Sequence, residues 1–210
     1  APLLIVLWFV VFFYLLNSLY EDRKDRSILF WKSLPVSDTL TVVAKLITAL
    51  IVVPLVYLAG IVVLQLVGLI LLTVAALNTD IAIWATIWSP ANILAKWLVY
   101  LGLIGFYSIW ALPFYAWLLA VSSYAKSVPL VWAIGVPFAL SIAERIVTGR
   151  SIVSEWISIH SLPVSFLNAN TPIIDNIQSN LFSLQMLSAI VVGGGLVVVA
   201  IWMRSRADEI

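Results

Sequence analysis

Long apolar runs separated by short polar segments dominate the chain. Each run holds close to the twenty apolar residues that a helix needs to cross a hydrocarbon core of about 30 Å. The runs are continuous and do not alternate in hydrophobicity, which favours helices over the strands of a membrane barrel. The pattern therefore predicts an all-α, polytopic transmembrane helix bundle that forms a single transmembrane domain over 1-210. Its five predicted spans are roughly 2–19, 47–77, 93–120, 128–147 and 181–203.

The second run begins before its span and is too long for a simple crossing. From about residue 38 to 46, polar residues such as Thr41 and Lys45 interrupt the apolar ones. We expect this part to lie at the membrane interface as an amphipathic helix whose N-terminus is capped by Ser37 or Asp38. Pro54 is expected to kink the helix as it turns into the membrane.

Composition strengthens the membrane prediction and excludes several classes of function. The chain is 63% hydrophobic and 10% charged, with a mean hydropathy of +1.13, whereas soluble domains are about a quarter charged. It has no cysteine and one histidine, which excludes disulfides, thiolate sites and histidine-rich metal sites, so no metal site is predicted. The net charge of +1 gives no sign of nucleic-acid binding.

The positions of the basic residues predict an orientation. Three segments, 20–45, 121–127 and 204–210, fall on one side of the predicted spans and contain eight of the eleven Lys and Arg residues. The other three are Lys96, Arg145 and Arg150. Because cytoplasmic loops are enriched in Lys and Arg, we expect the C-terminus in the cytoplasm and the first residues outside.

The segment 20–37 is the most distinctive hydrophilic part of the chain. Six consecutive charged residues follow the first span, and an amphipathic stretch and a proline come next. The segment could serve as a basic membrane anchor, or as a docking element for a cytoplasmic protein. Its acidic residues slightly favour docking, because an anchor has no use for them. The candidate docking residues are Glu21, Asp22, Arg23, Lys24, Asp25, Arg26, Ile28, Leu29, Trp31, Leu34 and Pro35.

This segment resembles the loop after the second transmembrane helix of ABC-2 type permeases, the membrane subunits of bacterial ABC exporters. The matching residues are Asp22, Arg23, Lys24, Ser27, Ile28, Leu34, Pro35, Val36, Ser37 and Lys45. One departure is Arg26, where many relatives have glycine. The order of the later hydrophobic segments is also similar to that family.

The resemblance implies a multi-pass subunit of the bacterial inner (plasma) membrane. It implies a dimer of permeases, expected to be a homodimer, with the segment 20–37 as the coupling helix against a cytosolic ABC ATPase subunit. No phosphate-binding motif of the G-x-x-x-x-G-K-[ST] type is present, so ATP and Mg are expected on the partner and no cofactor in this chain. Family subunits usually have six helices, so a first helix and an external domain are expected outside this sequence.

Polar residues within the spans are the second group of candidates. Gln65, Glu144 and Arg145 could line a substrate path. The alternatives are an interhelical hydrogen bond for Gln65 and an interfacial ion pair or snorkelling for Glu144 and Arg145. Gly193 to Gly195 are expected to allow close helix packing.

The segment 148–180 is expected to form short helices at the outer interface. It contains Glu155, His160 and Asp175, but no hydrolase or metalloprotease motif. The leading hypothesis is therefore an exporter permease for an amphipathic or lipid-like cargo. A scaffold subunit without transport remains an alternative, and a membrane-embedded hydrolase a weaker one.

Overall fold

The computed structural model describes residues 2–33, 35–161 and 172–207, and these residues are helical or connecting, with no strand among them. This confirms the predicted all-α class. The elements are α1 (Pro2–Lys24), α2 (Ser27–Ser33), α3 (Asp38–Ile47), η1 (Thr48–Val52), α4 (Val53–Ala76), η2 (Trp84–Trp88), α5 (Ser89–Ala91), α6 (Ile93–Trp110), α7 (Leu112–Tyr124), α8 (Pro129–Thr148), α9 (Ile152–Ser161), α10 (Ile173–Leu181) and α11 (Leu184–Ser205).

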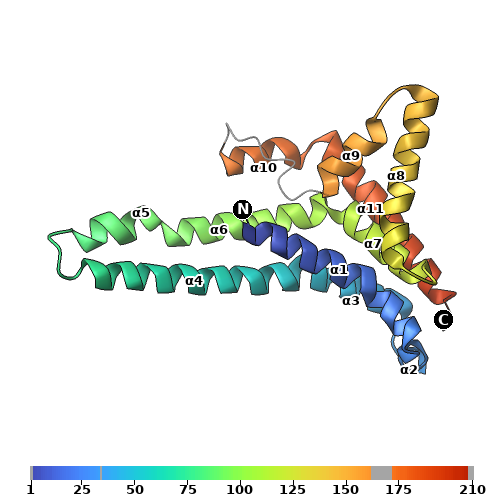
Figure 1. Ribbon diagram of the computed structural model, residues 1–210, viewed down its shortest axis with the longest axis horizontal. Helices are drawn as coiled ribbons and strands as arrows, with labels where there is room; N and C mark the ends of the chain where they lie inside the picture. Colours follow the sequence, from blue (N-terminus) through green and yellow to red (C-terminus); the bar gives the residue numbers. More distant parts are fainter. Residues whose placement is uncertain (1, 34, 162–171, 208–210) are drawn as a thin grey trace.

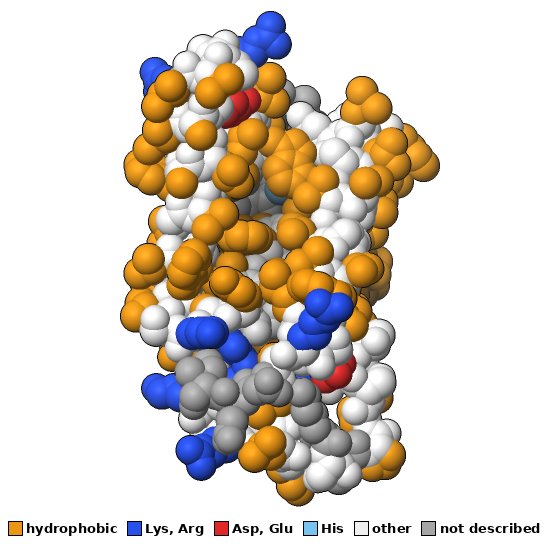
Figure 2. All heavy atoms as spheres, turned by 90° about the vertical axis from the view of Figure 1, so that its right-hand side faces the viewer, with side chains coloured by type: hydrophobic (Ala, Val, Ile, Leu, Met, Phe, Trp, Pro, Cys, Tyr) orange, Lys and Arg blue, Asp and Glu red, His pale blue; other side chains and the backbone are white. Residues whose placement is uncertain are grey.

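Within the described residues, five continuous helical stretches are long and apolar enough to cross a membrane. The predicted number of spans is confirmed, and the chain is a multi-span helical membrane protein. Side-chain chemistry agrees, since hydrophobic side chains cover the middle of the face in Figure 2, and Lys and Arg gather toward its two ends. The stretches are Ile5–Lys24, Asp38–Ala76, Trp84–Trp110, Pro129–Thr148 and Leu184–Ser205.

Helix α7 is the centre of the bundle, although it is too short to be one of these five stretches. It packs against α11 and α1, and α8 and α9 lie beside it. Helices α4 and α6 instead form a long hairpin that extends away from this core (Figure 1). Most residues of α7 are buried, whereas α4 is largely exposed. The core therefore lies at the α1–α7–α11 junction and not along the hairpin.

The third predicted span differs from the structure, because the helix expected over 93–120 breaks at Ala111. The backbone of Ala111 is non-helical (φ −90°, ψ 4°), and Pro113 is in the first turn of α7. Proline has no N–H to continue the helical ladder and restricts the residue before it, so α6 ends at Trp110. Membrane-spanning length is instead reached upstream, from Trp84 to Trp110.

Glycine allows α7 to begin directly against α11. A Cβ atom at Gly193 would lie 2.7 Å from Leu112 Cγ, closer than Cβ atoms approach other atoms, and 3.0 Å from Pro113 N, a very tight contact. The expected role of Gly193 in close packing is therefore confirmed. Gly194 and Gly195 have open space at the same position, so close packing does not explain them.

The entry to the second span follows the sequence prediction at its start. The Ser37 hydroxyl accepts a hydrogen bond from Leu40 N (3.1 Å), so Ser37 caps α3. The helix then changes to π-helical geometry over η1, just before Pro54. In a regular helix Pro54 would leave the Leu50 carbonyl without a donor, and the Ser108 hydroxyl of α6 lies 2.7 Å from that oxygen.

The same solution recurs at the proline inside α8. Pro137 cannot donate to the carbonyl of Ala133, and the Trp117 indole Nε1 of α7 donates to that oxygen at 3.0 Å. Backbone groups in a membrane must find partners within the protein. The carbonyls of Leu50 and Ala133 therefore each accept a hydrogen bond from a neighbouring helix, and these two bonds link the helices.

Candidate functional site

The segment 20–37 forms a helical end and a short separate helix at one end of the bundle, called the α2 end here (Figure 1). Helix α1 continues through the charged residues to Lys24, and a turn then leads to α2. Arg26 in this turn has a φ of 61°, the left-handed conformation that favours glycine. Asp25 Oδ1 accepts a hydrogen bond from Ser27 N (3.0 Å), and this bond lowers the pKa of the Asp25 carboxyl.

Asp22 faces into the protein and joins three helices. Its Oδ2 lies 2.7 Å from Lys45 Nζ of α3 and 3.3 Å from a terminal guanidinium nitrogen of Arg204 of α11. Arg204 Nε lies 3.2 Å from Asp38 Oδ1. These two groups form an ion pair but not a hydrogen bond. Lys45 Nζ also donates to the backbone oxygen of Ser18. Two carboxylates and two cations thus form a charge-balanced cluster that fixes α1, α3 and α11 together.

Arg23 is also internal, and only 5% of it is exposed. Its terminal guanidinium nitrogen donates to the carbonyls of Ser122 (3.0 Å) and Ala125 (2.6 Å) at the C-terminus of α7. The last carbonyls of a helix lack helical donors and attract cations. The Ser122 hydroxyl accepts hydrogen bonds from the Leu19 and Tyr20 N–H groups of α1, both at 3.0 Å. Arg23 and Ser122 together fix the end of α1 against the end of α7.

The remaining described candidates divide by exposure. Ile28 is buried (1% exposed) and anchors α2 to the body of the protein, whereas Leu29 and Trp31 are 55% and 40% exposed. Phe30, which sequence analysis did not single out, is 60% exposed and packs edge-to-face on Trp31. Leu34 lies outside the described residues. The outward-facing candidates are Glu21, Lys24, Asp25, Arg26, Leu29, Trp31 and Pro35.

The three candidates for a substrate path do not form one site, because Gln65 is on α4 and the adjacent Glu144 and Arg145 are near the end of α8. Gln65 Oε1 accepts a hydrogen bond from Trp97 Nε1 (3.1 Å), which joins α4 to α6 as expected for an interhelical bond. Glu144 accepts from the N–H groups of Ile152 (3.1 Å) and Val153 (2.8 Å) and so caps α9. Arg145 is exposed at the end of α8.

The polar residues that could suggest hydrolysis are likewise separate. Glu155 accepts a hydrogen bond from Ser151, and Asp175 is exposed on α10. His160 is buried, with its ring nitrogens 2.8 Å from Trp156 O and 3.3 Å from Gln185 O. Among the described residues, no group of three or more His, Cys, Asp or Glu side chains could hold a metal ion. Residues 162–171 of this segment lie outside the described structure.

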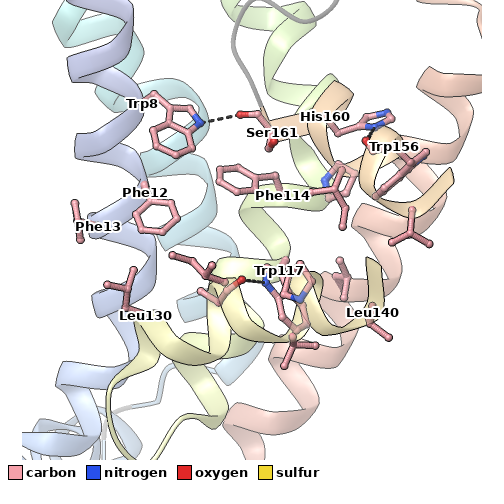
Figure 3. Close-up of a pocket in the computed structure, with 18 of the residues that line it drawn as sticks. Trp8, Phe12, Phe13, Phe114, Trp117, Leu130, Leu140, Trp156, His160 and Ser161 are labelled. Atoms are coloured by element: carbon pink, nitrogen blue, oxygen red, sulfur yellow. Dashed lines mark hydrogen bonds between the residues drawn. The ribbon is translucent and has the colours of Figure 1, made fainter. Parts of the chain in front are cut away.

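A second site, which the sequence did not predict, is a pocket of about 630 Å³ between α1, α7, α8 and α9. Its wall is almost entirely apolar and rich in aromatic rings (Figure 3). Trp8 and Phe12 of α1 stack near Phe114 of α7, with ring centroids 5.7 and 6.1 Å from that ring. The wall combines residues more than 100 positions apart, so periodicity within single helices could not reveal it.

Comparison with known proteins adds no identification: no family model, no curated protein and no solved structure matches the chain.

Proposed function

We propose that this chain is the permease subunit of an ATP-driven ABC exporter, with α2 as its coupling helix. The observation that carries the proposal is the two-sided character of the segment 20–37. One side is fixed to the bundle through Asp22, Arg23 and Ile28. The other side presents Leu29, Phe30 and Trp31 beside exposed charged residues. A coupling element needs both a rigid connection to the spans and an exposed surface for its partner.

The backbone of the turn before α2 supports the resemblance to ABC-2 permeases. Arg26 stands where many members of that family have glycine, and its φ of 61° is a conformation that glycine adopts without steric cost. Arg26 therefore adopts a backbone conformation that glycine would also adopt at this position.

In the proposed complex the α2 end faces the cytoplasm of a bacterial inner membrane. ATP and Mg bind to a separate cytosolic ATPase, and a second permease subunit, expected to be an identical copy, completes the transporter. A movement of α2 would reach α3 and α11 through the contacts of Asp22 with Lys45 and Arg204. The apolar interior suits an amphipathic or lipid-like cargo moved by alternating access.

The test is capture of a cytosolic ABC ATPase from the source organism, using the detergent-solubilised protein. Trp31→Ala removes an exposed aromatic side chain from the proposed docking surface. Central aromatic residues of an interface contribute about 2 kcal/mol or more, so affinity should fall by about thirtyfold. Trp132→Ala is the matched control, because Trp132 is 44% exposed and Trp31 is 40% exposed; it should leave affinity unchanged.

The outcomes separate the functional classes. Loss of the ATPase from Trp31→Ala alone, together with ATPase stimulation by the unmodified protein, would support a coupling role. Binding without stimulation would favour a scaffold subunit. If the unmodified protein binds no ABC ATPase, the exporter proposal is wrong.

A further inference from the structure

The mouth of the apolar pocket opens between α1 and α8. The lining residues with the greatest exposure come from these two helices: Phe9 (48%) and Phe13 (47%) from α1, and Ile134 (57%) and Leu140 (56%) from α8. Both helices belong to the membrane-spanning set. The solvent at the mouth is therefore the hydrocarbon of the bilayer and not water.

The pocket wall offers hydrocarbon contact and no free indole donor. Each of its tryptophans directs its indole N–H elsewhere: Trp8 to Ser161 O (2.7 Å), Trp117 to Ala133 O (3.0 Å) and Trp156 to Ser188 Oγ (2.9 Å). Figure 3 shows the Trp8 and Trp117 bonds as dashed lines between residues that line the cavity. The His160 nitrogens likewise face backbone oxygens. The interior therefore favours an apolar occupant, and the pocket volume is in the range of small-molecule sites.

Two cations lie near the connection between α8 and α9, beyond the lining residues Leu140 and Val153. Arg145 is five residues after the lining residue Leu140, about 7.5 Å along the helix axis. Arg150 is three residues before the lining residue Val153. Both side chains are exposed, and neither forms an ion pair with another residue of the described part of the chain. The neighbouring carboxylate of Glu144 is occupied by the N–H groups at the start of α9.

We propose that this pocket binds one acyl chain of an anionic membrane phospholipid, whose phosphate lies against Arg145 and Arg150. The apolar interior receives the chain, and the two guanidinium groups meet the headgroup at the membrane boundary, where Arg pairs strongly with phosphate. The lipid is a resident ligand that fills the gap between α1 and α8. This site does not depend on the transport function proposed above.

The experiment is native mass spectrometry of the full chain, incubated in mild detergent with an equimolar mixture of phosphatidylglycerol and phosphatidylcholine. The unmodified protein is expected to retain one phosphatidylglycerol. Ile134→Trp places a larger side chain in the pocket mouth and should lower retention about tenfold. Ile142→Trp is the matched control, on the same helix and 44% exposed but outside the lining; it should retain the lipid. Leu130→Trp is a second pocket variant if Ile134→Trp does not fold.

The headgroup contact has its own variant. Arg145→Gln with Arg150→Gln should lower phosphatidylglycerol retention about tenfold and abolish the preference over phosphatidylcholine, since charge-assisted hydrogen bonds are lost. Lys96→Gln, another exposed cation, should change neither. Equal retention by the pocket variants and the unmodified protein would overturn the acyl-chain site. Unchanged headgroup preference in the arginine variant would overturn the phosphate contact. A separate Ile134→Cys variant tests for a protein occupant: a disulfide between two copies of this variant would mean that a second copy, and not a lipid, covers the pocket.

Discussion

The two ends of α1 are attached to the rest of the protein by different chemistry. At the α2 end, Asp22 pairs with Lys45 and Arg204, and Arg23 binds the last carbonyls of α7. Toward the opposite end, neutral indole N–H groups bind backbone carbonyls of α9. Trp8 donates to Ser161 O of α9 (2.7 Å) and so attaches α1, and Trp110 donates to Ile159 O of the same helix (2.9 Å) and so attaches α6.

The difference follows from how each group tolerates burial. A charge in an apolar environment is costly unless it is paired, so charged joints require several partners at once. An indole N–H is neutral and needs only one acceptor, and the rest of its ring adds apolar contact. The carbonyls of Ile159 and Ser161 on α9 each accept one such aromatic N–H group. We infer that the α2 end is the more sensitive of the two to single substitutions.

The largest expected effect is at Asp22, because one carboxylate holds two cations. Asp22→Ala leaves Lys45 and Arg204 without this partner, and the Arg204 side chain is only 3% exposed. Breaking a buried ion pair costs about 3–5 kcal/mol. We expect the free energy of unfolding in detergent to fall by about 3 kcal/mol, the low end of that range, since Asp22 and Lys45 are 14% and 21% exposed.

Glu21→Ala provides the control, because it removes a neighbouring but exposed carboxylate and should change stability by less than about 0.5 kcal/mol. Equal destabilisation by both variants would mean that the charge of the helix end matters and not the buried cluster.

The sequence predicted the features that are determined by residues close together along the chain. Hydropathy predicted the helical spans, and the local Ser37 signal predicted the cap of α3. The break at Ala111 also had a local signal in Pro113, which the apolar run concealed. The partners of Asp22 had no such signal, because Arg204 lies 182 positions away. Within the segment 20–37 the sequence identified the charged residues but could not separate buried Arg23 from exposed Lys24, since that depends on where α7 ends.

The aromatic end should respond less strongly. Trp110→Phe removes the donor to Ile159 O but keeps most of the ring, so we expect a loss of about 1 kcal/mol in the free energy of unfolding, the usual net contribution of one hydrogen bond. Trp8→Phe should cost less, because Tyr107 also donates to Ser161 O (3.3 Å).

Trp84→Phe is the control for both, since Trp84 is 73% exposed and should show no loss. Denaturant titration of the three variants measures the order. A loss at Trp110→Phe as large as that at Asp22→Ala would contradict the inferred difference between the two ends.

The smallest effect is expected at Asp25, beyond the buried cluster. Its carboxylate accepts the Ser27 N–H at the start of α2, one of the N–H groups that a helix leaves without a helical partner. Asp25→Ala should therefore speed amide hydrogen exchange in Ser27–Ser33 without changing the melting temperature of the bundle.

The hydrogen bond from Ser27 lowers the pKa of Asp25 below its ordinary value of 3.8. The charged carboxylate thus supports α2 above that pH, and its support is lost as the pH falls through the lowered pKa. Asp25→Asn, which keeps an acceptor oxygen but no charge, should lack this acid-dependent change. Faster exchange throughout α1 in Asp25→Ala would show instead that Asp25 belongs to the joint of the bundle, and that the boundary between the fixed and exposed sides of the segment lies beyond it.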